Sequence, residues 1–385
     1  MTTVLVIEHK ASPFSRACLV AYLILIVYAS WYPFSGWQNN NLAAIVDVVK
    51  QWPRYWTVFD ASINVVGYIP LGSLIVFALY PRMQHGWAIV VASFCGLLLS
   101  MTMEGVQYFL PSRVTSLLDV ITNAGGTLLG AMIGTRLIPM LLEKGRLRLL
   151  GKQWLHHESS RELLVLGLWP LAQIFPQAYL FGLGQLLPIF SSWLDEFLDI
   201  DIDLATVLLN GFELNADEFL LSETFITACG CTGAALMCLF LLNRHAPKFW
   251  LACLLLLAAL ASKALASALL FSPDIAFAWM TPGAKGGLIV SVIMLYGFSF
   301  APTHIQRRLA ILMLLMSLAL SNLIPNNPYF MLSMQNGIQG KFLNFYGAAQ
   351  FLSVIWPFVA LWYLLKYSQY AKTPEKLQKL EKISQ

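Results

Sequence analysis

Polar and charged side chains recur inside apolar stretches in the first third of the chain, where each is costly unless it is paired or binds a ligand. The candidate binding residues in this part of the chain are Asn64, Glu104, Gln107, Arg113, Asp119 and Asn123. Glu104 precedes Gln107 by three residues, so the two share one face of a helix. Asp119 precedes Asn123 by four residues, with the same consequence. We expect these acids, amides and arginine to lie at one depth and to bind a polar group.

Catalysis by this group would need one of the two acids, Glu104 or Asp119, as a general base, with Arg113 holding an anion. The structural alternative is that Glu104 pairs with Arg113 while the amides only join helices. Every histidine falls in an expected loop or tail, which excludes Ser-His or Cys-His catalysis at these positions. Metal-ligand, P-loop and dinucleotide spacings are absent, so we expect neither a metal nor another cofactor. The sequence favours a protein without catalytic activity and identifies no catalytic residue, but it leaves an enzyme open.

Lys263 is a further candidate, in the stretch Leu-Ala-Ser-Lys-Ala-Leu-Ala. We expect it near the middle of an apolar segment, where a lysine must face protein or water or extend toward the membrane surface. Binding of a substrate or a lipid phosphate and a structural ion pair both explain it, and the sequence does not separate them.

The composition indicates which elements position these residues. The chain has 385 residues, 58% of them hydrophobic and 11% charged, with a mean hydropathy of +0.67. Soluble proteins are about 45–50% apolar and about 25% charged. Apolar runs of about 20 residues match the hydrocarbon thickness of a bilayer. We therefore predict an all-α, polytopic integral membrane protein. No basic stripe interleaved with aromatic residues suggests nucleic-acid binding.

About ten transmembrane segments are expected. They are 14–32, 62–80, 87–109, 116–142, 162–189, 222–242, 249–271, 286–301, 309–325 and 346–366. Basic residues gather before the first segment and after every even-numbered one, which predicts that both termini are cytoplasmic. The expected parts are a four-helix membrane domain (1–142), a basic cytoplasmic loop (143–161), a six-helix membrane domain (162–372) and a cytoplasmic tail (373–385). With this topology the candidate residues of the first domain lie near the membrane surface that faces away from the cytoplasm.

Glycines explain how the helices of the first domain approach one another. Gly126 and Gly130 are four residues apart, a small-residue spacing that allows close contact between helix backbones. Pro70 and Gly72 are expected to loosen the second segment and to free backbone carbonyls.

The order of these motifs resembles the VanZ-like family over roughly residues 14–142. The matching patterns are Asn-x-x-x-x-x-Pro-x-Gly, Glu-x-x-Gln-x-x-x-x-x-Arg and Asp-x-x-x-Asn-x-x-Gly-x-x-x-Gly. The family's signature positions fall on Asn64, Pro70, Gly72, Glu104, Gln107, Arg113, Asp119, Asn123, Gly126 and Gly130. The family includes a bacterial accessory protein of teicoplanin resistance, so the resemblance implies the bacterial inner membrane and the cell envelope. Small members of the family end near the position of residue 142, whereas this chain continues with further expected transmembrane segments.

The sequence therefore favours an inner-membrane protein whose outward-facing polar pocket recognises a cell-envelope molecule. The ligand would be a lipid-linked or glycan precursor, or an amphiphilic antibiotic. A membrane enzyme or carrier acting on lipid-linked glycans is one alternative. A non-catalytic assembly factor for envelope polysaccharide machinery is the other. Membrane lipids are expected partners and nucleic acids are not, while the oligomeric state is not predicted.

Overall fold

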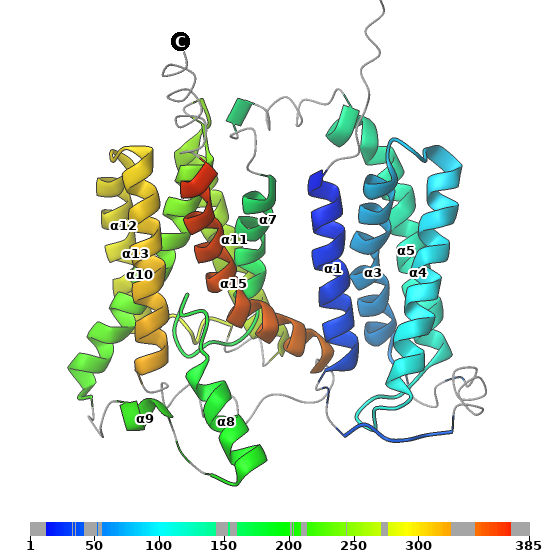
Figure 1. The fold of residues 1–385 in the computed structure, drawn as a ribbon, viewed down its shortest axis with the longest axis horizontal. Helices are drawn as coiled ribbons and strands as arrows, with labels where there is room; N and C mark the ends of the chain where they lie inside the picture. Colours follow the sequence, from blue (N-terminus) through cyan, green and yellow to red (C-terminus); the bar gives the residue numbers. More distant parts are fainter. Residues whose placement is uncertain are drawn as a thin grey trace, which may run out of the picture. The chain divides into compact units, whose positions relative to one another are not determined.

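A computed structural model describes most of the chain. The described residues are 13–32, 34, 36–41, 52, 56–143, 153–154, 160–200, 202, 204–208, 214–243, 245–270, 276–324 and 343–370. Every regular element among them is a helix (Figure 1). Eight of these helices are long and apolar enough to cross a membrane, which confirms the predicted all-α membrane class. Most of the expected basic loop 143–161 and all of the tail 373–385 lie outside the described residues.

The chain divides into two compact units, Met1–Gln153 and Trp154–Gln385. The first unit contains four long helices that stand side by side in Figure 1. They are α1 (Pro13–Trp31), α3 (Val58–Leu79), α4 (His85–Gln107) and α5 (Leu117–Ile138), and a short π-helical turn, η2 (Pro139–Glu143), continues α5. Thr57 and Asp60 form a capping box that starts α3, and the Ser116 side chain caps α5.

Helices α3 and α5 pack at backbone distance, as the glycine spacing predicts. A Cβ atom added at Gly126 or Gly130 would overlap the carbonyl oxygen of Val65 or Ile69 in α3, respectively. From the other side, a Cβ atom at Gly72 would overlap the carbonyl of Thr127. The helix α3 stays continuous through Pro70, which lies inside it. This close approach brings the polar residues at the start of α5 against α3.

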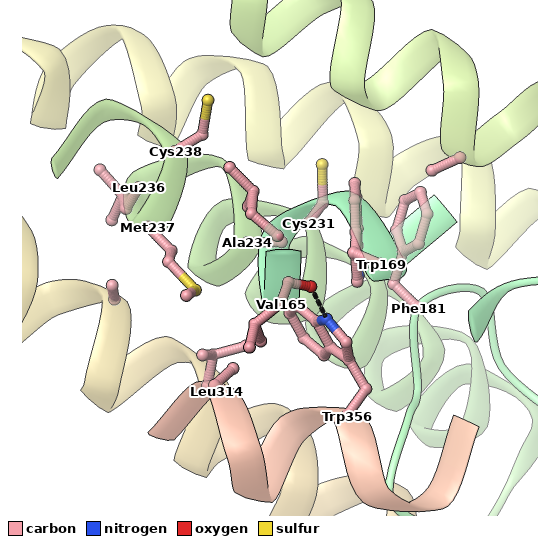
Figure 2. Packing of buried hydrophobic residues seen from close by; sticks show 14 of the residues in the cluster. Val165, Trp169, Phe181, Cys231, Ala234, Leu236, Met237, Cys238, Leu314 and Trp356 are labelled. Atoms are coloured by element: carbon pink, nitrogen blue, oxygen red, sulfur yellow. Dashed lines mark hydrogen bonds between the residues drawn. The ribbon is translucent and has the colours of Figure 1, made fainter. Parts of the chain in front are cut away.

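The second unit is built around α10 (Ala216–Leu241), which is buried from Ile226 to Leu241. The other helices are α7 (Ser160–Ala172), α8 (Leu187–Leu198), α9 (Leu204–Leu208), α11 (Lys248–Leu270), α12 (Pro282–Ser299), α13 (Thr303–Leu323) and α15 (Leu343–Tyr370). Figure 2 shows the core of this unit, where the indole of Trp356 donates a hydrogen bond of 2.7 Å to the carbonyl of Val165. A small cavity beside Trp356 and Trp169 has room for about one water molecule.

One expected transmembrane segment is not a continuous helix. The prediction of a single span over 162–189 is wrong, because α7 ends at Ala172 and residues 173–186 are irregular before α8 begins. Pro176 cannot donate to a helical ladder, and Gly184 adopts a left-handed φ of +82°. Most of the expected segment 286–301 lies in α12, an 18-residue helix that is not among the eight candidate membrane spans. The other eight expected segments correspond to those eight helices.

The irregular segment 173–186 is mostly buried, so protein groups must satisfy its backbone. Asn322 of α13 does so at the end of the segment. Its Oδ1 atom accepts hydrogen bonds from the N–H groups of Leu186 and Leu187, at 2.6 and 3.0 Å. Its Nδ2 atom donates to the carbonyl of Gly184 at 2.9 Å. An irregular backbone is thereby held in place among membrane-type helices.

Candidate functional site

The candidate site of the first unit lies where α4 ends and α5 begins. A tight hairpin joins the two helices, with backbone hydrogen bonds from Leu110 to Gln107 and from Arg113 to Leu110. Glu104 lies one turn before the end of α4 and is only 3% exposed. Its Oε2 atom accepts a hydrogen bond of 3.0 Å from the backbone N–H of Ser116. The carboxylate therefore lies at the positive end of the α5 dipole.

Asp119, in the first turn of α5, joins this helix to α3. Its Oδ1 atom accepts a hydrogen bond of 2.8 Å from Asn64 Nδ2. Glu104 interacts electrostatically with both Asp119 and Arg113, so the three charged residues lie in one neighbourhood. The structure thus brings together Asn64, Glu104, Arg113 and Asp119.

Arg113 and Gln107 contact α1 instead of a carboxylate. The Arg113 guanidinium donates to the carbonyl of Ala29 at 3.3 Å and also to that of Tyr32. Gln107 Nε2 donates to the carbonyl of Ser30 at 3.0 Å. These carbonyls belong to the C-terminal end of α1, where helical backbone acceptors have no partner within the helix. Burial lowers the pKa of Arg113 from its ordinary value, while Glu104 and Tyr32 oppose that shift.

Asn123 lies one turn further along α5 and contacts a different partner. Its Nδ2 atom donates to Ser100 Oγ in α4 at 3.0 Å. Its Oδ1 atom is buried without a hydrogen-bond partner among the described residues. The amide therefore links α4 to α5 below the acidic pair and retains one unused acceptor.

Three further polar side chains of this neighbourhood are not marked by the sequence motifs. They are Tyr68, Ser100 and Ser116. The hydroxyl of Tyr68 is within hydrogen-bonding reach of Ser100, and Tyr68 interacts electrostatically with Glu104. Tyr68 follows Asn64 by four residues in α3, so helical spacing alone assigns both to one face. That spacing is the signal that would have identified it.

Each of the two acids keeps one oxygen atom without a hydrogen-bond donor. Among the described residues, Glu104 Oε1 and Asp119 Oδ2 accept no hydrogen bond. Neither atom is sealed off from solvent, since neither belongs to the buried polar atoms that lack a partner. The arrangement therefore presents two acceptors to a ligand that donates hydrogen bonds.

A comparison with known protein families assigns this part of the chain. Residues 19–138 match the VanZ/LLP1 family model. The resemblance predicted from the motifs is confirmed, and the rest of the chain lies outside the match. Neither a curated protein nor a solved structure matches the chain. We call residues 19–138 the VanZ-like region; all the acids, amides and the arginine described above lie within it.

Lys263 lies in the second unit, outside the VanZ-like region. It lies in α11, 15 residues after the start at Lys248 and seven residues before the end at Leu270. The side chain is only 3% exposed. Its Nζ atom donates to the carbonyl of Phe175, in the irregular segment, at 3.3 Å. No acid of the described residues forms an ion pair with it.

Glu223 is a second buried ionisable residue of this unit, and it was not predicted from the sequence. It lies in α10 and is 4% exposed. The hydroxyl of Thr281 donates to Glu223 Oε1 and also caps α12. A Cβ atom at Gly283 would overlap the carboxylate, so a glycine is needed for this approach. The charge is placed at the N-terminus of α12, where the helix dipole favours it.

Proposed function

We propose that the VanZ-like region recognises the polar head of an amphiphilic cell-envelope molecule at the outward-facing surface of the inner membrane. The ligand class is a lipid-linked glycan precursor or an amphiphilic antibiotic. The head group binds beside the α4–α5 hairpin, while the apolar tail remains in the lipid. The chain acts as a binding protein of the bacterial inner membrane in this proposal.

The observation that carries the proposal is the pair of unused carboxylate oxygens, Glu104 Oε1 and Asp119 Oδ2. Ionised carboxylates accept strong hydrogen bonds, particularly where water is scarce. The hydroxyl and amide groups of a glycan head supply such donors. Arg113 does not compete for these acids, because its guanidinium donates to carbonyls of α1.

The position of the two acids also supports binding of an amphiphile. Glu104 lies near the end of one membrane-type helix and Asp119 near the start of the next. A head group at this level meets the carboxylates while its hydrocarbon chain contacts lipid. A site at the centre of a transmembrane helix would instead require the polar head group of the ligand to leave the membrane–water interface and enter the hydrocarbon core.

Binding of a purified probe tests the proposal. The full chain is placed in lipid nanodiscs and titrated with a fluorescent polyprenyl-diphosphate-linked disaccharide, and a lipoglycopeptide antibiotic is titrated separately. We expect the unmodified chain to bind at least one probe. Glu104→Gln and Asp119→Asn should each weaken binding by about tenfold or more, because each replaces a carboxyl oxygen that accepts hydrogen bonds with an amide NH₂ group that only donates them.

Asp195→Asn is the matched control, since Asp195 is an exposed acid of α8 in the second unit. It should bind like the unmodified chain. Thermal unfolding of each variant separates recognition from packing. If Glu104→Gln and Asp119→Asn lower the melting temperature but leave probe affinity unchanged, the acids serve helix assembly and the proposal is wrong. The proposal is also contradicted if the unmodified chain binds neither probe.

A further inference from the structure

The second unit holds a buried lysine against an interrupted helix. Lys263 Nζ contacts the carbonyl of Phe175, three residues after the last residue of α7. A buried ammonium group has three donors and a full charge, and one carbonyl satisfies only part of that requirement. The described residues supply no carboxylate to pair with it.

Two neighbours of Lys263 on its face of α11 have small side chains. Ala259 and Ala266 lie four residues before it and three residues after it, so all three share one buried face of α11. Both alanines are buried and end at Cβ.

Unsatisfied polar atoms also occur on both sides of Phe175. Gln173 and Gln177 are buried, and the Oε1 atom of each lacks a hydrogen-bond partner among the described residues. The Nε2 atom of Gln177 is engaged with the carbonyl of Ala172 and with Ser353 Oγ, which fixes the orientation of that amide. Buried acceptors without donors require a water molecule or a ligand hydroxyl group. The segment therefore offers two buried acceptors, each on a residue two positions from Phe175, whose carbonyl accepts a hydrogen bond from Lys263.

The depth of Lys263 indicates which anion reaches it. The helix α11 runs from Lys248 to Leu270, so Lys263 lies seven residues before its end. At 1.5 Å per residue this is about 10.5 Å along the helix axis. A lysine side chain bridges part of that distance toward the head-group layer. Phosphate is the anion that the membrane itself supplies at this level.

We propose that Lys263 and the irregular segment 173–186 form a second binding site, which holds a phosphate group bearing neighbouring hydroxyls. The ammonium group of Lys263 neutralises the phosphate, and the free amide oxygens of Gln173 and Gln177 accept hydrogen bonds from the hydroxyls. The phosphate belongs either to a glycerol-type lipid head group or to a free phosphate ester. This site is separate from the VanZ-like region and does not depend on its function.

Two probes distinguish these sources of phosphate. Purified full-length chain is titrated in neutral detergent with phosphatidylglycerol, and separately with sn-glycerol 3-phosphate, while the melting temperature is recorded. Phosphatidylcholine is the lipid control, because its head group carries no net charge and no hydroxyl. We expect phosphatidylglycerol to raise the melting temperature, and sn-glycerol 3-phosphate to do so only if the soluble ester also enters the site.

Lys263→Met keeps the length of the side chain and removes its charge. The variant should lose the probe-dependent shift, with an apparent affinity lower by about tenfold or more. Lys285→Met is the matched control, since Lys285 is an exposed lysine of α12 and should keep the shift. Lys263→Arg retains the charge and should keep part of the shift, which gives a folded comparison if Lys263→Met is poorly produced.

Two results would overturn the proposal. The first is an unmodified chain that neither phosphate probe stabilises more than phosphatidylcholine does. The second is a Lys263→Met variant whose melting temperature is lower in all conditions but whose probe-dependent shift is unchanged. In either case Lys263 serves only to hold the backbone of the interrupted helix.

Discussion

At the scale of single residues, the polar side chains of the VanZ-like region have two different roles. Arg113 and Gln107 hold the C-terminal end of α1, where backbone carbonyls need donors. Glu104 and Asp119 contact the start of α5 and the amide of α3, and keep one oxygen each for another partner. The arginine thereby lies close to both α1 and Glu104 without forming an ion pair with that acid.

The effect of Arg113 on stability should depend on Glu104. Arg113→Met leaves the buried carboxylate of Glu104 without its nearby cation, which is more destabilising than removing both charges. We expect the double variant with Glu104→Gln to be more stable than the sum of the single changes predicts, by about 0.5–3 kcal/mol. Unfolding midpoints of the four proteins measure this coupling, and strict additivity would contradict it.

Arg113→Lys distinguishes the charge from the hydrogen bonds. A lysine keeps the positive charge near Glu104 but lacks the planar guanidinium that reaches two carbonyls of α1. We expect its stability to lie between those of the unmodified chain and Arg113→Met.

The sequence identified the acids and amides of this site, because polar residues stand out within apolar helices. Helical spacing predicted a shared face for Asp119 and Asn123, but in the structure Asp119 contacts Asn64 of α3 and Asn123 contacts Ser100 of α4. It did not predict that Arg113 and Gln107 bind α1, since the acceptors are backbone carbonyls and carry no residue-specific signal. Tyr68 was missed because tyrosine in a membrane helix is ordinarily an apolar packing residue.

At the scale of elements, close contact between α3 and α5 positions the acidic pair. Gly72, Gly126 and Gly130 allow this contact, because each faces a backbone atom of the opposite helix. Asn64 and Asp119 extend the same interface toward its polar end, where they form their hydrogen bond. The glycine contacts and the polar contact therefore belong to one helix pair.

Gly130→Ala should separate these two helices. The added Cβ overlaps the carbonyl of Ile69, so the backbone must shift, at a cost of roughly 1–3 kcal/mol. Gly125→Ala is the control in the same helix, because its Cβ meets no atom within 4 Å. Alanine is the better helix former, so this variant should be as stable as the unmodified chain or more stable. Equal melting temperatures for the two variants would mean that the contact is not tight.

The boundaries of the helices could not all be predicted from hydropathy. The apolar content of 162–189 suggested one span, but the helix ends at Ala172 and a buried irregular segment follows. Hydropathy measures whether residues tolerate burial, not whether the backbone is continuous. Side chains distant in sequence, such as Asn322, satisfy the irregular backbone, so its stability depends on tertiary contacts. The importance of Glu223 is hidden for the same reason, since its partner Thr281 belongs to another element.

At the scale of the whole molecule, the chain has two compact units, and the family match lies in the first of them. The VanZ/LLP1 match covers residues 19–138, within the first unit, and leaves the second unit without a family assignment. Each unit contains buried ionisable residues within membrane-type helices. The two proposed sites are therefore tested with separate probes and separate variants.

The proposed role of the VanZ-like region depends on which side of the membrane its α4–α5 hairpin faces. The distribution of basic residues predicts cytoplasmic termini, which directs the α4–α5 hairpin outward. The turn between α3 and α4 then faces the cytoplasm, because it lies at the opposite end of α4. Exposed residues at the two ends give a direct comparison: Ser112 in the hairpin and Met83 in the turn.

Labelling of Ser112→Cys in intact cells tests the central claim, that an outward-facing site beside this hairpin recognises an envelope molecule. An impermeant maleimide is added outside, with the unsubstituted chain as the blank and Met83→Cys as the cytoplasmic control. We predict rapid labelling of Ser112→Cys, slowed by the polyprenyl-linked disaccharide, and labelling of Met83→Cys only after the membrane is permeabilised. Labelling of Met83→Cys but not Ser112→Cys in intact cells would contradict the account.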